Sequence, residues 1–206
     1  MKGNRMKTLT LTAALIAGLT GSALAMAQAV VGQPAPLFTG VDTAGKAVSL
    51  DSLKGKYVVL EWVNPDCPFV QKHYNSGNMQ NTQKHAAGKQ VVWLSVSTSA
   101  APDGDPKAAA SLASWAKEKK ATANAILVDS GKIGRAYGAR TTPHMYLIDP
   151  AGKLVYAGAI DSKPSANAAD IPGASNYVVQ AIDEATAGKP VSKPVTQPYG
   201  CSVKYG

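Results

Sequence analysis

Residues 138–158 decide the fold, and they read GARTTPHMYLIDPAGKLVYAG. Two short runs that favour β-strands, 145–148 and 154–157, flank a Pro-Ala-Gly turn at 150–152. Apolar runs separated by proline and glycine turn residues are typical of two paired strands. The stretch therefore predicts a β-hairpin.

Three further apolar runs precede this hairpin and also predict strands. They are YVVLEWV at 57–63, VVWLSVS at 91–97 and AILV at 125–128. Each run is rich in β-branched or aromatic residues, which suit a pleated sheet. We expect these strands and the hairpin to form one sheet.

Three segments between and after these strands predict helices. The first runs from just after Cys67 towards residue 87, with a break near residues 75–77. The second begins at Pro106, which follows a capping Asp105, and the third extends over about 175–188. Each has an apolar stripe or the capping and stop residues of a helix.

The composition is that of one compact domain. The 206 residues include 45% hydrophobic and 17% charged side chains, which is ordinary for a globular chain. Two cysteines are too few for a disulfide-rich scaffold, a four-thiolate zinc site or an iron–sulfur cluster. The element order β-α-β-α-β-β-α, preceded by a looser segment at 30–51, indicates an α/β fold.

Residues 1–27 are typical of a secretory signal peptide. They hold three basic residues and no acidic one, and their apolar run at 9–25 ends in small residues that permit cleavage after Ala27. A membrane anchor is the alternative, but small and polar residues interrupt this run well short of ~20 strongly apolar positions. We expect an exported protein, periplasmic or secreted.

The chain after residue 27 carries a small excess of positive charge. It holds 18 basic and 13 acidic residues, and no basic block is interleaved with aromatic residues. This pattern gives no support to nucleic-acid binding. No later segment is apolar enough to predict a membrane span.

Residues 60–74, LEWVNPDCPFVQKHY, carry the clearest chemical signal. Cys67 stands where the helix should begin, and Pro68 suits the first helical position. The free N–H groups and the dipole of a helix start stabilise an anion, which lowers the pKa of a thiol. The neighbouring Asp66 carboxylate opposes that shift. From this segment alone, a reactive thiolate and an inert buried cysteine are both open.

Taken together, these stretches resemble the thioredoxin superfamily in its redoxin or peroxiredoxin-like (AhpC/TSA-like) branch. In that fold a loop ending in Thr-Pro, with the proline cis, precedes a strand, an Asp-x-x-Gly turn and another strand. Thr142, Pro143 and the predicted hairpin match this order, and the resemblance covers about residues 31–187. It implies a thioredoxin-like α/β fold, a central mixed sheet flanked by helices, in which cis-Pro143 faces Cys67.

The segment around Cys67 departs from two patterns of that superfamily. A Cys-x-x-Cys pair is absent, because Asn64 and Val70 stand three residues to either side of Cys67. The Pro-x-x-x-Thr/Ser-x-x-Cys pattern of typical peroxiredoxins is also absent, because Leu60 and Asn64 occupy its first two defining positions. The segment is more similar to a peroxiredoxin-like subgroup with an Asn-x-x-Cys-Pro-Phe-Val pattern.

Residues 189–206 read as an extended, proline-rich tail behind a domain at 28–188. The tail carries Cys201 in QPYGCSVKYG, an ending that also looks like that subgroup. The thirteen residues from Gly188 to Cys201 reach about 40 Å in an extended polyproline conformation, so Cys201 can reach Cys67. Three states stay open: a resolving thiol for an oxidised Cys67, a permanent structural disulfide, and two unpaired cysteines.

Two weaker features complete the candidate site. Arg140, beside the Thr-Pro loop, is either a support for a thiolate or peroxide oxygen or a solvated loop charge. Cys67, His73, His144 and Met145 offer soft copper ligands, but no Cys-x-x-x-Cys motif accompanies them. We therefore expect no metal and no cofactor.

These features predict an exported thiol-dependent oxidoreductase. Cys67 is the expected nucleophile and Cys201 the expected resolving thiol, with Thr142, Pro143 and Arg140 around them. The expected substrate is a peroxide or the disulfide of a redox partner. The alternative is a non-catalytic thioredoxin-fold module for binding or structure, stabilised by a disulfide between the two cysteines.

Overall fold

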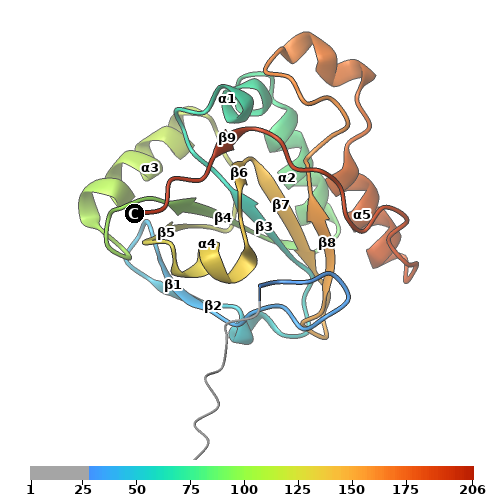
Figure 1. The fold of residues 1–206 in the computed structure, drawn as a ribbon, viewed down its shortest axis with the longest axis horizontal. Helices are drawn as coiled ribbons and strands as arrows, with labels where there is room; N and C mark the ends of the chain where they lie inside the picture. The colour runs from blue at the N-terminus through green and yellow to red at the C-terminus, as the bar shows by residue number, and fades with distance from the viewer. Residues whose placement is uncertain (1–27) are drawn as a thin grey trace, which may run out of the picture.

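The computed structural model describes residues 28–206, so the predicted signal peptide at 1–27 lies outside the described residues. A mixed sheet with the strand order β2-β1-β5-β4-β3-β7-β8 forms the centre of the described chain (Figure 1). Its strands are β1 (Thr39–Asp42), β2 (Ala47–Ser49), β3 (Val58–Trp62), β4 (Val92–Thr98), β5 (Ala125–Asp129), β7 (His144–Ile148) and β8 (Leu154–Gly158). β3, β4 and β5 are parallel to one another, and the remaining neighbours pair antiparallel.

Helices pack on both faces of this sheet. They are α1 (Pro68–Asn75), α2 (Asn78–Gly88), α3 (Pro106–Glu118), α4 (Lys132–Tyr137) and α5 (Tyr177–Thr186), with short 3-10 turns at Asp51–Leu53 and Ala168–Gly173. α1, α2 and α5 share one apolar core with Val59, Trp93 and Met145 of the sheet. α4 packs on the opposite face with Leu60 and Trp62.

Burial on both faces explains why the central strands read as continuous apolar runs. Every residue of β3 and of β7 is buried. Along β3, Val59 belongs to the core beneath α1 and α2, whereas Val58 and Leu60 belong to the core beneath α4. A strand buried on both faces has no position at which an exposed polar side chain is favoured.

The five predicted strands lie in one sheet, as expected, and the helices follow the sequence signals. Asp105 caps α3 by accepting the N–H of Ala108 at 2.8 Å. The expected break after Asn75 falls at Gly77, whose φ of +78° lies in the left-handed region that separates α1 from α2. α5 is capped by Asn176.

The sequence analysis did not predict β1, β2 or α4. The strands β1 and β2 form a hairpin inside the segment at 30–51, and their ladder pairs only three residues of each strand. The helix α4 is six residues long and lies between Gly131 and Gly138, both in left-handed conformations. Elements this short carry too little periodicity to be read from a sequence window.

Residues 189–206 run back across the molecule from α5 towards β5 (Figure 1). Val195 forms an isolated bridge with Ala157 of β8. Further along, the strand β9 (Cys201–Ser202) pairs antiparallel with β6 (Thr141–Thr142) and forms a second, two-stranded sheet. Among residues 28–206, no helix has the length and apolar character needed to cross a membrane.

Candidate active site

Cys67 lies where the connection from β3 enters α1. It is the N-cap residue of α1, with Pro68 at the first helical position, and 1% of its surface is exposed. The protonated thiol donates a hydrogen bond to the carbonyl oxygen of Thr142 at 3.0 Å. The strand-to-helix connection therefore brings the Cys67 sulfur to the loop that precedes β7.

The Thr142–Pro143 peptide bond in that loop is cis, as the resemblance implies. Thr142 is also a residue of β6, and its partner across the β6–β9 ladder is Cys201. The structure thus gathers Cys67, Thr142, Pro143 and Cys201 at one place. Both cysteines are free thiols.

The surroundings of the two thiols move their pKa values in opposite directions. Burial has the largest influence and raises the pKa of Cys67, but nearby polar groups, the Cys201 thiol first among them, outweigh burial and leave the pKa lowered. Burial, the hydrogen bond to Cys67 and the Cys67 charge raise the pKa of Cys201 to about 11. Of the two thiols, Cys67 is therefore the more acidic.

Asp66 does not oppose this arrangement. Its side chain is exposed, and it is not among the groups that shift the pKa of Cys67. The backbone N–H of Asp66 donates to Asn64 Oδ1 at 2.9 Å, which shapes the turn before α1. Because the Asp66 carboxylate faces solvent, it opposes the stabilising effect of the helix start on a thiolate only weakly.

Gly200 allows the tail to approach the cis-proline loop. A Cβ atom at this position would lie 2.0 Å from the Thr142 carbonyl oxygen and 2.7 Å from its carbon, and the φ of Gly200 is +132°. Only glycine fits such a close backbone contact at this backbone angle. The contact fixes the tail one residue before Cys201.

Tyr199 anchors the tail two residues before Cys201. Its hydroxyl donates to Asp161 Oδ1 at 2.5 Å and lies 3.2 Å from Nε2 of His73. Its ring packs edge-on against Phe69 of α1, with centroids 5.8 Å apart. The anchor joins the tail to the helix that begins at Cys67.

A buried carboxyl group that the sequence analysis missed lies beneath α1 and α2. Glu61 of β3 is fully buried and accepts hydrogen bonds from Tyr74, Trp93 and Ser95. Burial raises its pKa, and these hydrogen bonds oppose the rise. Its sequence signal was a single acidic residue inside an otherwise apolar strand, YVVLEWV.

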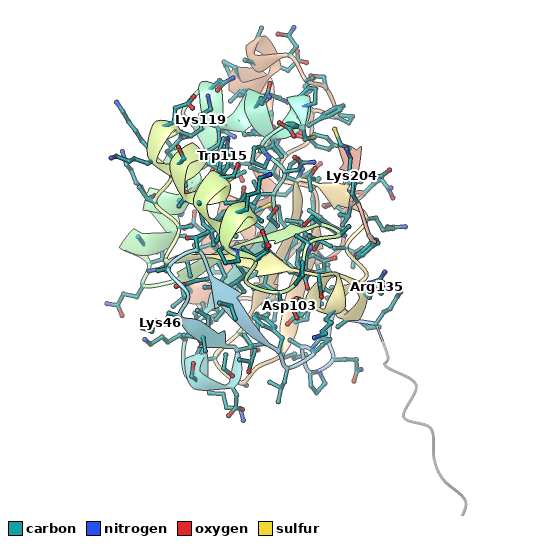
Figure 2. All side chains as sticks on the ribbon, turned by 90° about the vertical axis from the view of Figure 1, so that its left-hand side faces the viewer. Lys46, Asp103, Trp115, Lys119, Arg135 and Lys204 are labelled. Atoms are coloured by element: carbon teal, nitrogen blue, oxygen red, sulfur yellow. The ribbon has the colours of Figure 1, made fainter. Side chains whose placement is uncertain are left out.

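Arg140 lies just before the β6 strand, and no hydrogen bond joins its side chain to either thiol within the described residues. It is exposed, lines a cavity of about 930 Å³ together with His144 and Tyr146, and is not among the groups that shift the pKa of Cys67. Arg135 lines the same cavity (Figure 2), and its Nη2 donates to the Gly206 carbonyl oxygen at 2.9 Å. The expected role of Arg140 as a support for the sulfur stays a prediction.

The copper ligands considered from the sequence do not form a cluster. Within residues 28–206, no group of three or more His, Cys, Asp and Glu residues could hold a metal ion. Burial lowers the pKa of His144 to about 3, and its Nδ1 accepts the N–H of Arg140 at 3.3 Å. His73 instead contacts the tail through Tyr199.

Comparison with known proteins places this geometry in a family. A family model described as the AhpC/TSA family matches residues 31–157, which is more than half of the chain. The match includes the strand and helix around Cys67, the Thr142–Pro143 loop and most of the hairpin. Cys201 and the tail lie beyond it.

One curated relative and two solved structures show how far the likeness extends. The thiol-disulfide oxidoreductase ResA of Bacillus subtilis (strain 168) is 30% identical over 124 residues, which is 60% of this chain and 64% of that protein. A hypothetical protein from Sinorhizobium meliloti 1021 has a TM-score of 0.68 at 22% identity, over 87% of this chain and 97% of its own. An uncharacterized conserved protein from Geobacillus kaustophilus has a TM-score of 0.65 at 25% identity, over 86% and 93%. These comparisons show a thioredoxin-like fold.

Proposed function

Because the chain belongs to the AhpC/TSA family, within the redoxin branch of the thioredoxin superfamily, we propose that it is a thiol-dependent oxidoreductase. In this proposal Cys67 is the nucleophile and Cys201 is the resolving thiol. The observation that carries it is the meeting of both cysteines at Thr142: the Cys67 thiol donates to the Thr142 carbonyl oxygen at 3.0 Å, and Cys201 is the ladder partner of Thr142. At this place the pKa of Cys67 is lowered and that of Cys201 is raised. Cys67 is thereby the more reactive thiol, and Cys201 stays protonated until the resolving step.

The proposed reaction with a disulfide partner has two exchange steps. The Cys67 thiolate attacks one sulfur of the partner's disulfide, which forms a mixed disulfide and releases the other sulfur as a thiolate that takes up a proton. Cys201 then loses its proton and attacks Cys67, which releases the partner's second thiol. The partner's disulfide is reduced to two thiols, and the protein's two thiols are oxidised to the Cys67–Cys201 disulfide.

The same pair also suits a peroxide, and the burial of Cys67 favours this second candidate. Only 1% of the Cys67 surface is exposed, so a small oxidant reaches the sulfur more easily than a protein does. The thiolate attacks a peroxide oxygen, the O–O bond breaks, and Cys67 becomes a sulfenic acid while the leaving oxygen takes up a proton. Cys201 then displaces water from the sulfenic acid and forms the same disulfide.

The reduction potential of the pair tests the proposal. Equilibration of the reduced protein with glutathione redox buffers should give a potential above about −300 mV, because exchange requires a labile disulfide. A potential well below that value indicates the structural disulfide of the non-catalytic alternative. Parallel oxidation by hydrogen peroxide and by glutathione disulfide, followed by intact mass, identifies the faster oxidant and hence the substrate class.

Export and domain limits are part of the proposal. We infer that residues 1–27 direct export to the periplasm or the exterior and are removed, and that 28–188 form the domain that 189–206 complete. The acid-free basic start and the small residues before Gln28 support this inference. N-terminal sequencing of the protein from the exported fraction should give a start between residues 26 and 30; a retained Met1 in that fraction would contradict it.

A further inference from the structure

The β6–β9 ladder alone is a weak holder for a resolving thiol. It pairs only two residues of each strand, Thr141 with Ser202 and Thr142 with Cys201. A two-residue ladder without other support opens easily in water. After Cys201 the tail is also held by the Val203 N–H, which donates to the Arg140 carbonyl oxygen at 3.0 Å. Before Cys201, an attachment on the other side of the ladder is needed if this thiol is to stay over Cys67.

We propose that Tyr199 is a positioning residue for Cys201. A buried series of hydrogen-bonded side chains beneath the tail holds the Tyr199 hydroxyl in place. This inference rests on the proposed role of Cys201 as the resolving thiol. Tyr199 does not touch the Cys67 sulfur in this role. It acts by holding the backbone two residues before Cys201.

The hydrogen bonds that reach Tyr199 run in one direction, from the Asn78 amide through His73 and Tyr199 to Asp161. The Asn78 side-chain amide donates to Nδ1 of His73 at 2.7 Å, so the ring proton of His73 lies on Nε2. Burial lowers the pKa of His73 to about 4, and the ring is neutral at physiological pH. Nε2–H then donates to the Tyr199 oxygen at 3.2 Å, and the Tyr199 hydroxyl donates to Asp161. His73 and Tyr199 each accept one hydrogen bond and donate one, which orients the Tyr199 hydroxyl.

The series of hydrogen bonds ends at the buried carboxylate of Asp161, which accepts the hydroxyl of Tyr199. The Asp161 side chain is 2% exposed, and its Oδ2 has no hydrogen-bond partner within the described residues. Lys72 Nζ lies 3.8 Å from Oδ2 and donates instead to the Lys163 carbonyl oxygen at 3.0 Å. If the tail lifts, the carboxylate loses its hydroxyl donor, and a buried charge with fewer partners is costly. The carboxylate therefore favours the docked tail.

The anchor and the nucleophile are fixed to the same rigid element. Phe69 and His73, which contact Tyr199, belong to α1, and Cys67 caps that helix. Six helical residues from Cys67 to His73 span about 9 Å, and two extended residues from Tyr199 to Cys201 span about 7 Å. The two lengths differ by only about 2 Å, so a tail bound at Tyr199 brings Cys201 back towards the start of α1. Gly200 between them permits the close approach to the Thr142 carbonyl.

The Tyr199→Phe substitution tests this role, because it removes the hydroxyl and keeps the ring against Phe69. The matched control is Tyr57→Phe, which removes a hydroxyl that donates to the Ala185 carbonyl oxygen at 2.7 Å, at a site that does not hold the tail. In glutathione buffers, the effective concentration of Cys201 towards Cys67 should fall at least about tenfold in Tyr199→Phe, the effect of losing a hydrogen bond to a charged group. It should stay at the wild-type value in Tyr57→Phe.

A second readout separates positioning from a general loss of stability. The absorbance of the thiolate at 240 nm against pH should show a higher pKa for Cys67 in Tyr199→Phe, because the Cys201 donor is withdrawn, and no change in Tyr57→Phe. An unchanged effective concentration and an unchanged pKa in Tyr199→Phe overturn the positioning role while the proposed function stands. A wild-type protein that forms no Cys67–Cys201 disulfide overturns the proposed function, and the positioning role with it.

Discussion

Cys67 and Cys201 have different acidities although burial acts to raise the pKa of both. The Cys201 thiol, as a hydrogen-bond donor, lowers the pKa of Cys67, whereas burial and then the neighbouring Cys67 raise that of Cys201 to about 11. Substitution Cys201→Ala removes this donor, so the pKa of Cys67 should rise. Ultraviolet titration of the reduced wild-type protein should resolve two steps, the lower from Cys67. A single step for both thiols near the ordinary thiol value is the opposing result.

Gly200 should be intolerant of any side chain because the Thr142 backbone occupies the place of a Cβ atom. In Gly200→Ala the methyl group meets the Thr142 carbonyl at 2.0 Å, so the tail must move and Cys201 with it. We expect slower disulfide closure after oxidation, measured by rapid acid quench and mass. The control Gly152→Ala also imposes a positive φ, of +82°, but meets no atom within 4 Å. It should lose about 1–2 kcal/mol of stability and close at the wild-type rate.

Glu61 should make the protein less stable as the pH rises. Burial raises its pKa, and a group whose pKa is raised in the folded state stabilises fully below its unfolded value, about 4.3. That stability is lost as the pH rises through the folded value. The substitution Glu61→Gln imitates the protonated form, so its free energy of unfolding relative to wild type should increase between pH 4 and 8. Urea denaturation across this range measures it, and a pH-independent difference would contradict the account.

At the residue level, the sequence identified the residues that meet at the two cysteines, but it did not identify the buried carboxyl group nearby. Cys67, Thr142 and Cys201 meet in space, and their catalytic roles stay a prediction. Arg140 lines a cavity, and its expected role beside the sulfur stays a prediction because nearness in sequence to a loop does not fix the direction of a long side chain. Glu61 was missed although one acidic residue inside a buried strand is unusual enough to signal a hydrogen-bonded carboxyl.

Among the elements, those with a strong local signal were predicted and those that depend on distant partners were not. The helix α3 has its cap, its proline and its apolar stripe within fourteen residues. By contrast, β6 and β9 are two residues each and exist only because they pair across about sixty positions of sequence. No local sequence pattern predicts such a ladder. The sequence showed only that the tail is long enough to reach Cys67.

The strand β9 should open more easily than the central sheet. Its backbone is held by the β6 ladder and by the Val203 N–H, which donates to the Arg140 carbonyl oxygen at 3.0 Å. The strand β3, by contrast, is paired on both sides over its full length. Hydrogen exchange followed by mass spectrometry should show faster exchange for a peptide covering 200–204 than for one covering 58–62. Equal protection of the two peptides would mean that the tail belongs to the rigid core.

For the whole molecule, one architecture serves both stability and the proposed chemistry. The sheet is covered by α1, α2 and α5 on one face and by α4 on the other, and the tail crosses its edge to reach the start of α1 (Figure 1). The AhpC/TSA match accounts for the position of Cys67, and the tail beyond it supplies the second thiol. The proposed redox pair therefore requires both the family fold and the additional C-terminal residues.

The most direct test of a nucleophile and a resolving thiol is a mass measurement on three reduced proteins treated with glutathione disulfide and quenched with acid. Wild type should lose two hydrogens as the Cys67–Cys201 disulfide forms. The variant Cys201→Ser should hold one glutathione on Cys67. Cys67→Ser should be modified more slowly, because burial still raises the pKa of Cys201 after the Cys67 thiol is removed. Equal adducts on the two single variants, or no reaction in any of the three, would contradict the account.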